Sequence, residues 1–186
     1  SDITAELTGS DVTFTAPADF NGSETFSVSV SDAEYTDSQS ITVTVNAVND
    51  APTANAASGA TNEDQSTVIA LSGSDIDGDN LFFSLNVDAV YGSVTLDGSL
   101  ATYTPNTNYY GVDSFIFSVS DGEYTSSADV SVSISAVNDA PVLATVSDVS
   151  FDEDGSGSLS LSADDVDGDD LTYGITGGSD ITATLD

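Results

Sequence analysis

The sequence contains no lysine, arginine or histidine, although it has 32 acidic residues and a formal net charge of −32. Proteins bind the phosphate backbone of nucleic acids through Lys and Arg, so a nucleic-acid-binding function is excluded. Attraction to anionic lipid surfaces fails for the same reason. Without His, Cys or Lys, the usual general bases, thiol nucleophiles and Schiff-base formers are also missing. We therefore expect no enzymatic activity.

Cysteine is absent as well, which excludes disulfide bonds and thiolate metal sites. The apolar runs are far shorter than the roughly 20 residues of a membrane-spanning helix, so no membrane insertion is expected. Charged residues make up only 17% of the chain, against 39% hydrophobic residues. This balance differs from that of a disordered acidic segment and predicts a packed core.

An internal repeat of about ninety residues organises the sequence. Residues 48–52 (Val-Asn-Asp-Ala-Pro) recur unchanged at 137–141, and residues 31–36 recur with one substitution at 120–125, both 89 positions later. A constant period of this kind marks an array of similar units. The phase divides the chain into the C-terminal half of one unit, a complete unit and the N-terminal half of a third: 1–48, 49–137 and 138–186.

The two half-units suggest a partner. Residues 138–186 of one molecule could be completed by residues 1–48 of a neighbouring copy, and contacts of this head-to-tail kind build open filaments. The alternative is that the chain is one slice of a longer polypeptide, in which neighbouring repeats make the same contacts.

Apolar residues alternate with Ser and Thr along most of the complete unit. The alternating positions are Ile69, Leu71, Leu81, Phe83, Leu85, Val94, Leu96, Ala101, Tyr103, Phe115, Phe117, Val119, Val130, Val132 and Ile134. A period of two, interrupted by turn signals such as Asp97-Gly98, predicts about seven short strands per unit and no helix. The expected fold class is all-β, with tandem seven-stranded antiparallel β-sandwiches.

Acidic side chains are concentrated in phrases that recur with the repeat. The pattern Asp-x-Asp-Gly-Asp occupies residues 75–79 and returns at 165–169. Carboxylates this close repel one another by roughly 1–4 kcal/mol per pair near a protein surface, and the chain has no basic side chain to neutralise them. Calcium, which takes about 6 to 8 oxygen ligands in an adaptable shell, would relieve this repulsion.

Other metal motifs fit less well. An EF-hand loop that starts at Asp75 would need glycine at its sixth position and glutamate at its twelfth, where the sequence has Asn80 and Asn86. The glycine-rich nonapeptide of a calcium β-roll is absent too. The recurring acidic phrases fall mainly in turns and junctions, which gather at the ends of a sandwich. At one end we expect five of these residues to converge, namely Asn49, Asp50, Asp75, Asp77 and Asp121.

These phrases resemble the calcium-binding motifs of the cadherin family. Residues 137–141 resemble its interdomain linker, residues 165–173 its DxD-containing stretch and residues 120–123 its late Asp-x-Gly turn, while Glu63 stands where the family has an early glutamate. The match is closer to the cadherin-like tandem repeats of large bacterial surface proteins and adhesins. The resemblance covers essentially the whole chain and implies an Ig-like or cadherin-like fold.

The resemblance also implies Ca²⁺ as the cofactor and a ligand set for each junction. The first junction would use Asn49, Asp50, Asp75, Asp77 and Asp121, and the second Glu63, Asp64, Asn138, Asp139, Asp165 and Asp167. The remaining candidate ligands are Asp79, Asp169, Glu153 and Asp32, the last of which would need an Asp-x-Asp-Gly-Asp phrase upstream of residue 1. The number of ions per junction stays open.

The function expected from these features is that of a calcium-rigidified structural array, a stalk or filament segment at the cell surface. An alternative is a module that binds carbohydrates or cell surfaces, for which Tyr109 and Tyr110 are the visible candidates. A third is a halophilic protein whose acidity only serves solvation. That reading predicts acids on all outward strand positions, which here are mainly Ser and Thr.

Overall fold

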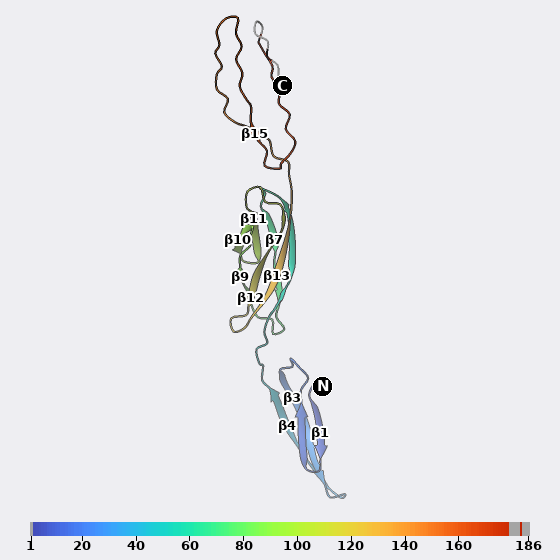
Figure 1. The fold of residues 1–186 in the computed structure, drawn as a ribbon. Helices are drawn as coiled ribbons and strands as arrows, with labels where there is room; N and C mark the ends of the chain where they lie inside the picture. The colour runs from blue at the N-terminus through green and yellow to red at the C-terminus, as the bar shows by residue number, and fades with distance from the viewer. Residues whose placement is uncertain (1, 179–182, 184–186) are drawn as a thin grey trace.

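The structure, a computed structural model, describes residues 2–178 and residue 183, and these residues form β-strands joined by turns. Figure 1 shows a row of three parts, with the N-terminal strands at one end, a closed sandwich in the middle and the C-terminal segment at the other end. The N-terminal part holds β1 (Thr4–Thr8), β2 (Asp11–Thr15), β3 (Gly22–Ser31) and β4 (Thr36–Val45). The C-terminal part holds β14 (Val142–Leu143) and β15 (Ala163–Asp164).

The middle part is a two-layered β-sandwich. Its strands are β5 (Thr53–Asn55), β6 (Ala57–Asn62), β7 (Thr67–Ala70), β8 (Ser72–Ser74), β9 (Phe82–Val87), β10 (Gly92–Asp97), β11 (Leu100–Pro105), β12 (Gly111–Ser120) and β13 (Thr125–Ser135). One sheet has the order β6-β13-β12-β9 and the other the order β10-β11-β7, while β5 pairs with β8. Because β5 and β6 follow one another around Ala56, and β7 and β8 around Leu71, nine strand pieces make up the seven strands that were predicted. The predicted all-β sandwich is confirmed.

One strand pair departs from the antiparallel expectation, since β6 and β13 run parallel, with Val132 beside Gly59. An odd number of strands explains this pairing. A chain that crosses the sandwich seven times enters at one end and leaves at the other, so its first and last strands run in the same direction. The same count makes the unit suitable for a linear array, because each unit delivers the chain to the pole where the next unit begins.

The core of the sandwich lies between the two sheets and consists of the alternating apolar residues. Its buried members come from both layers: Ile69, Leu71, Val94, Ala101, Tyr103, Phe115, Phe117, Val119, Val130, Val132 and Ile134. Phe83 packs its ring against Phe117 at a centroid distance of 6.2 Å. The period-two pattern therefore identifies the inward face of each strand correctly.

A buried carboxylate near the start of β12 lies at one end of this core. Asp113, only 4% exposed, accepts hydrogen bonds from the Tyr103 hydroxyl (2.9 Å), from the backbone N–H groups of Val90 (3.2 Å) and Tyr91 (2.8 Å), and from that of Ser114 (2.8 Å). Burial, followed by the hydrogen bond and the negative charge of Asp113, raises the pKa of Tyr103. The carboxylate thus satisfies backbone donors that would otherwise be buried without a partner.

The N-terminal part contains two hairpins, β1–β2 and β3–β4. Its inward ring contact is between Phe14 and Phe26, whose centroids lie 5.1 Å apart. Glu24 accepts hydrogen bonds from the backbone N–H groups of Asp2 and Ile3, which repeats the role of Asp113 exactly one period earlier in the chain. The repeat therefore preserves a structural carboxylate as well as the acidic turns.

Candidate metal centres at the unit junctions

The loop of residues 75–79 gathers three carboxylates. Asp75 Oδ1 accepts hydrogen bonds from the backbone N–H groups of Asp77 (2.9 Å), Gly78 (3.1 Å) and Asp79 (3.3 Å). Gly78 has a φ of +82°, a conformation that costs a glycine little and an L-residue considerably more. The wrapped loop leaves oxygens of Asp75, Asp77 and Asp79 within 4.8 Å of one another, so three negative charges face one small volume.

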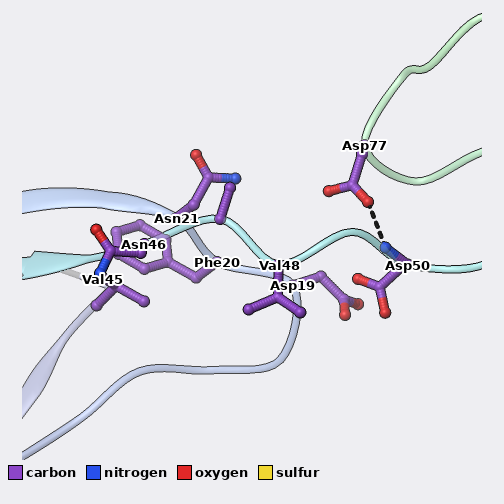
Figure 2. Close-up of a pocket in the computed structure, with 9 residues that line it drawn as sticks. Asp19, Phe20, Asn21, Val45, Asn46, Val48, Asp50 and Asp77 are labelled. Carbon is purple, nitrogen blue, oxygen red and sulfur yellow. Dashed lines mark hydrogen bonds between the residues drawn. The ribbon is translucent and has the colours of Figure 1, made fainter. Parts of the chain in front are cut away.

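The linker between the N-terminal part and the sandwich is tied to this loop. The backbone N–H of Asp50 donates to Asp77 Oδ2 at 2.8 Å (Figure 2). The Asn49 side-chain amide donates to Asp121 Oδ2 at 2.9 Å. Asp121 Oδ1 in turn accepts from the backbone N–H groups of Glu123 (2.7 Å) and Tyr124 (2.6 Å). The five residues expected to converge at the first junction therefore do lie together there.

A pocket of about 280 Å³ lies at this first junction, and residues of both parts line it. Asp19 comes from the loop between β2 and β3, Asp50 from the linker and Asp77 from the sandwich (Figure 2). Asp19 was not among the candidate residues of the sequence analysis. Its counterpart one period later is Asn108, and both residues have a left-handed backbone, with φ of +59° and +56°. This shared position for an oxygen-bearing side chain is the signal that could have identified Asp19.

The second junction repeats the arrangement with different residues. Glu63 is 3% exposed, and its Oε1 accepts a hydrogen bond from the backbone N–H of Val137 at 2.5 Å. The backbone N–H of Asp139 donates to Asp167 Oδ2 at 2.6 Å, as Asp50 does to Asp77 at the first junction. Oxygens of Glu63, Asp64 and Asp139 lie within 4.8 Å of one another. The linker thus joins acidic groups of the sandwich to acidic groups of the C-terminal part.

Hydrogen bonds to the backbone position three further residues here, Asp64, Asn138 and Asp165. Asp64 has a φ of +58° and its Oδ1 accepts a hydrogen bond from the backbone N–H of Asn108 at 3.1 Å. The Asn138 side-chain amide donates to the backbone carbonyl of Asp139 at 2.7 Å. Asp165 Oδ1 accepts from the backbone N–H groups of Asp167 (3.0 Å) and Asp169 (3.4 Å), as Asp75 does in its own loop.

The linker aspartates, Asp50 and Asp139, have pKa values raised above the ordinary value. Loss of solvent, followed by the charges of Asp19, Asp77 and Asp75, raises the pKa of Asp50. Loss of solvent, followed by the charges of Asp167, Asp64, Glu63 and Asp165, raises the pKa of Asp139. Both shifts have the same sign and the same causes, because each linker places a half-buried carboxylate among other carboxylates.

One buried carboxylate oxygen at each junction has no hydrogen-bond partner among the described residues. These atoms are Asp75 Oδ2 at the first junction and Asp139 Oδ2 at the second. A buried charged oxygen without a donor is costly unless a cation neutralises it. Carboxylate and amide side chains surround both atoms, and this all-oxygen donor set is the one that calcium prefers. The residues present therefore fit a hard divalent cation.

Two candidate residues belong to neither group of clustered carboxylates. Asp32 lies in the turn between β3 and β4, where its Oδ1 accepts hydrogen bonds from the backbone N–H groups of Tyr35 (2.7 Å) and Glu34 (3.1 Å). These bonds lower the pKa of Asp32. Glu153 is exposed in the segment between β14 and β15. Each of them sits at an end of the chain where, within the described residues, no second unit abuts.

The two candidate glycan-binding tyrosines differ in their surroundings. The ring of Tyr109 stacks on that of Tyr91, with centroids 4.3 Å apart and planes 6° from parallel, and its hydroxyl donates to the carbonyl of Val112 at 2.9 Å. Tyr110 is 57% exposed. Tyr109 is therefore occupied by packing, and only Tyr110 offers a largely free aromatic face.

Residues 49–133 match the family model of the bacterial Ig domain. Over these residues the chain is similar to that family. The matched region begins at the linker asparagine and ends within β13, so it includes both parallel partners of the sandwich. Among the described residues, no helix is long and apolar enough to cross a membrane.

Several solved structures resemble parts of the chain. Human protocadherin-24 EC1-2 is 20% identical with a TM-score of 0.40, covering 53% of this chain and 50% of that one. Drosophila N-cadherin EC1-4 is 13% identical with a TM-score of 0.41, covering 76% and 40%. An endo-fucoidan hydrolase of glycoside hydrolase family 107 is 18% identical with a TM-score of 0.37, covering 74% and 22%. Among curated protein sequences, none matches significantly.

The chain spans half or less of the length of each of these three proteins, and all three TM-scores are low. The Ig-like fold of the complete unit is therefore supported by the family match and by the strand topology. That match confirms the Ig-like fold expected from the sequence for the complete unit.

Proposed function

We propose that the chain is a segment of a calcium-rigidified extracellular stalk or filament, with calcium bound at the junctions between consecutive units. The observation that supports this proposal is the partnerless buried carboxylate oxygen at each junction, Asp75 Oδ2 and Asp139 Oδ2. Each lies in a cluster of carboxylates, in a protein that has no basic side chain at all. Consecutive units, in one polypeptide or in neighbouring copies, would then add end to end along one axis.

The ligands proposed for each junction come from both sides of a linker. At the first junction they are Asn49, Asp50, Asp75, Asp77, Asp79 and Asp121, with Asp19 added from the preceding part. At the second they are Glu63, Asp64, Asn138, Asp139, Asp165, Asp167 and Asp169. Calcium would supply the positive charge that these oxygens lack.

The mechanical consequence follows from the position of the linkers. In the absence of a cation, carboxylates on the two sides of a linker repel one another, and the peptide that joins the parts is free to bend. A shared ion replaces this repulsion by attraction to both sides at once, so the angle between neighbouring units becomes fixed. Rigidity along the array then depends on the calcium concentration outside the cell.

Calcium titration tests this proposal. Isothermal titration calorimetry of the 186-residue chain should show at least one ion per junction, and small-angle scattering should give a longer, stiffer particle in calcium than in chelator. Removing the charge of Asp139 (Asp139→Asn) should stabilise the chelated protein, because repulsion is relieved, and destabilise the calcium-loaded protein, because a ligand is lost. Asp129→Asn, an exposed strand position, changes the charge equally and is the matched control.

The reversal of sign is the decisive readout. If Asp139→Asn has the same effect in calcium and in chelator, or if scattering profiles in the two conditions superimpose, the junction carboxylates are only solvated turn residues and the proposal is wrong. When the free calcium concentration is about 100 times the dissociation constant, binding stabilises the folded protein by about 2.7 kcal/mol per site. Thermal unfolding resolves a change of this size easily.

A further inference from the structure

Two neighbouring loops of the sandwich expose large apolar side chains. They are residues 88–91, between β9 and β10, and residues 106–110, between β11 and β12. Four such side chains on these loops and at the start of β12 form what we call the tyrosine surface: Val90 (73% exposed), Tyr91 (47%), Tyr110 (57%) and Val112 (66%). Single exposed apolar residues are ordinary, but a group of them on adjacent segments marks an interaction site.

Tyr109 joins these residues into one fixed surface. Its ring stacks on that of Tyr91, with centroids 4.3 Å apart, and its hydroxyl donates to the carbonyl of Val112 at 2.9 Å. The two loops are also tied through their backbones, because the N–H of Asn106 donates to the carbonyl of Tyr91 at 2.8 Å. The surface is therefore held in place before a ligand arrives, which lowers the entropy cost of binding.

The internal repeat shows that the fold does not require this surface. Core positions and acidic turns recur one period apart, as residues of the scaffold should. The exposed residues do not recur: 89 positions earlier the chain has Asp2, Asn21 and Ser23 in place of Tyr91, Tyr110 and Val112. A fold that accepts small polar residues at these positions does not need large apolar ones there, so their presence points to an intermolecular contact.

Contacts between consecutive units do not cover these positions. At the first junction a complete sandwich follows the N-terminal part, and Asn21 and Ser23 are nevertheless exposed. In Figure 1 the two parts meet end to end at the linker and not side by side. The tyrosine surface occupies the equivalent place beside the second junction, where the backbone N–H of Asn108 donates to Asp64. It is therefore open to a partner from outside the array.

The polar groups around the surface favour an uncharged ligand. The net charge of −32 repels polyanions. Residues 106–110, Asn-Thr-Asn-Tyr-Tyr, carry no charge, the carboxylate of Asp113 is buried, and Asp88 Oδ1 accepts hydrogen bonds from the backbone N–H groups of Ala89 and Val94. Amide and hydroxyl groups beside aromatic rings fit a ligand with apolar C–H faces and hydroxyls. A neutral sugar combines the two.

We propose that Tyr91 and Tyr110 form a binding surface for an uncharged glycan. Sugar rings stack on the exposed faces of these two side chains, and the polar side chains of residues 106–108 bond the sugar hydroxyls. Tyr109 is a positioning residue, because its ring supports that of Tyr91. This binding function goes beyond the calcium-dependent stiffness proposed above and does not depend on it.

A glycan array followed by a titration tests the proposal. The 186-residue chain should bind uncharged oligosaccharides on the array and not sulfated or uronic-acid ones. The uncharged oligosaccharide that binds best is then titrated by NMR, where saturation of the tyrosine ring protons should transfer to sugar C–H protons. Tyr110→Ala should weaken the affinity about tenfold, as for a central contact residue, whereas Tyr110→Phe keeps the ring face and should retain most of the binding.

Tyr124→Ala is the matched control. Tyr124 lies in the turn between β12 and β13, at the other pole of the sandwich, and its exposure of 44% is close to the 47% of Tyr91. Its removal should leave the affinity unchanged. Tyr110 is more than half exposed, so Tyr110→Ala should fold, which thermal unfolding checks.

Three results would overturn the inference: no uncharged glycan of the array binds, only anionic glycans bind, or Tyr110→Ala and Tyr124→Ala bind as well as each other. Titrations run in calcium and in chelator keep this outcome separate from the calcium proposal. Glycan binding that depends on Tyr110 in either condition supports the tyrosine surface, even if the junctions bind no calcium.

Discussion

At the scale of single residues, aspartate carboxylates serve two purposes: some lie in the acidic clusters of the junctions, and others hold the fold together. Asp113 is of the second, purely structural kind. Its buried carboxylate accepts four hydrogen bonds from residues of three different segments. Asp113→Asn turns one acceptor oxygen into a donor that faces other donors. We expect a loss of about 1–3 kcal/mol in the free energy of unfolding, the usual cost of a buried polar group left unsatisfied.

Urea unfolding in chelator measures this effect without any contribution from calcium. Asp97→Asn, at the exposed end of β10, removes the same charge and should change stability by less than about 0.5 kcal/mol. Equal effects of the two substitutions would show that Asp113 acts only through its charge and not through its hydrogen bonds.

Residue by residue, the sequence predicted the acidic positions of the turns but not their neighbours. The residues of the 75–79 loop were identified because their spacing makes repulsion unavoidable. Asp19 and Asp113 were not, because nothing in the local pattern distinguishes a carboxylate that lines a junction or caps a core from one in solvent. Their positions depend on contacts between segments more than twenty residues apart, which a local reading does not reach.

At the scale of elements, the acidic loop depends on one glycine. Gly78 holds a φ of +82°, and a Cβ there would meet nothing within 4 Å, so Gly78→Ala adds backbone strain and no clash. A left-handed L-residue costs about 1–2 kcal/mol. If the loop relaxes without calcium and must return to this shape to bind it, the affinity should fall about 5- to 30-fold at the first junction.

Calorimetric titration measures this loss, and Gly174→Ala is the matched control, since Gly174 has open space without a left-handed backbone. Gly168, with a φ of +76°, is the counterpart in the second loop, and Gly168→Ala should weaken the second junction instead. Unchanged affinity at both junctions would mean that the loop binds calcium in some other conformation, or does not bind it.

The strands themselves were largely predictable. Alternation of apolar and hydroxyl residues marks the inward face of β12 and β13, and every core position read from it is buried. The interruptions at Ala56 and Leu71 and the parallel pair of β6 and β13 were not foreseen. Alternation shows which face of a strand is buried, but the partner of a strand is set by where the chain enters and leaves the sandwich.

At the scale of the whole molecule, seven crossings per unit and acidic linkers between units serve the same end. The crossings carry the chain from pole to pole, and the linkers place carboxylates of both neighbours around one small volume. With no basic side chains to form ion pairs, solvent conditions decide whether a junction attracts or repels. Calcium is one such condition, and pH is the other.

The pH dependence should therefore change sign with calcium. Asp50 and Asp139 have pKa values raised above the ordinary 3.8, so the chelated fold binds protons more readily than the unfolded chain does. Stability in chelator should rise as the pH falls from neutral toward these raised values. Below 3.8 it should fall again, because Asp32 and Asp121 have lowered pKa values, and the stability they contribute is lost as they become protonated. For Asp121, hydrogen bonds outweigh a desolvation effect of opposite sign.

In saturating calcium, stability should fall rather than rise as the pH is lowered from neutral toward the raised pKa values. Protons then compete with the ion for Asp50 and Asp139, so calcium affinity and thermal stability should both decrease as the pH falls through the same range. Thermal unfolding from neutral pH downward, in calcium and in chelator, measures the pH dependence of stability in both conditions. Asp50→Asn should remove the part of that pH dependence that comes from the first junction. Parallel curves in the two conditions would contradict this account, because they would mean that the raised carboxyls and the calcium ligands are different groups.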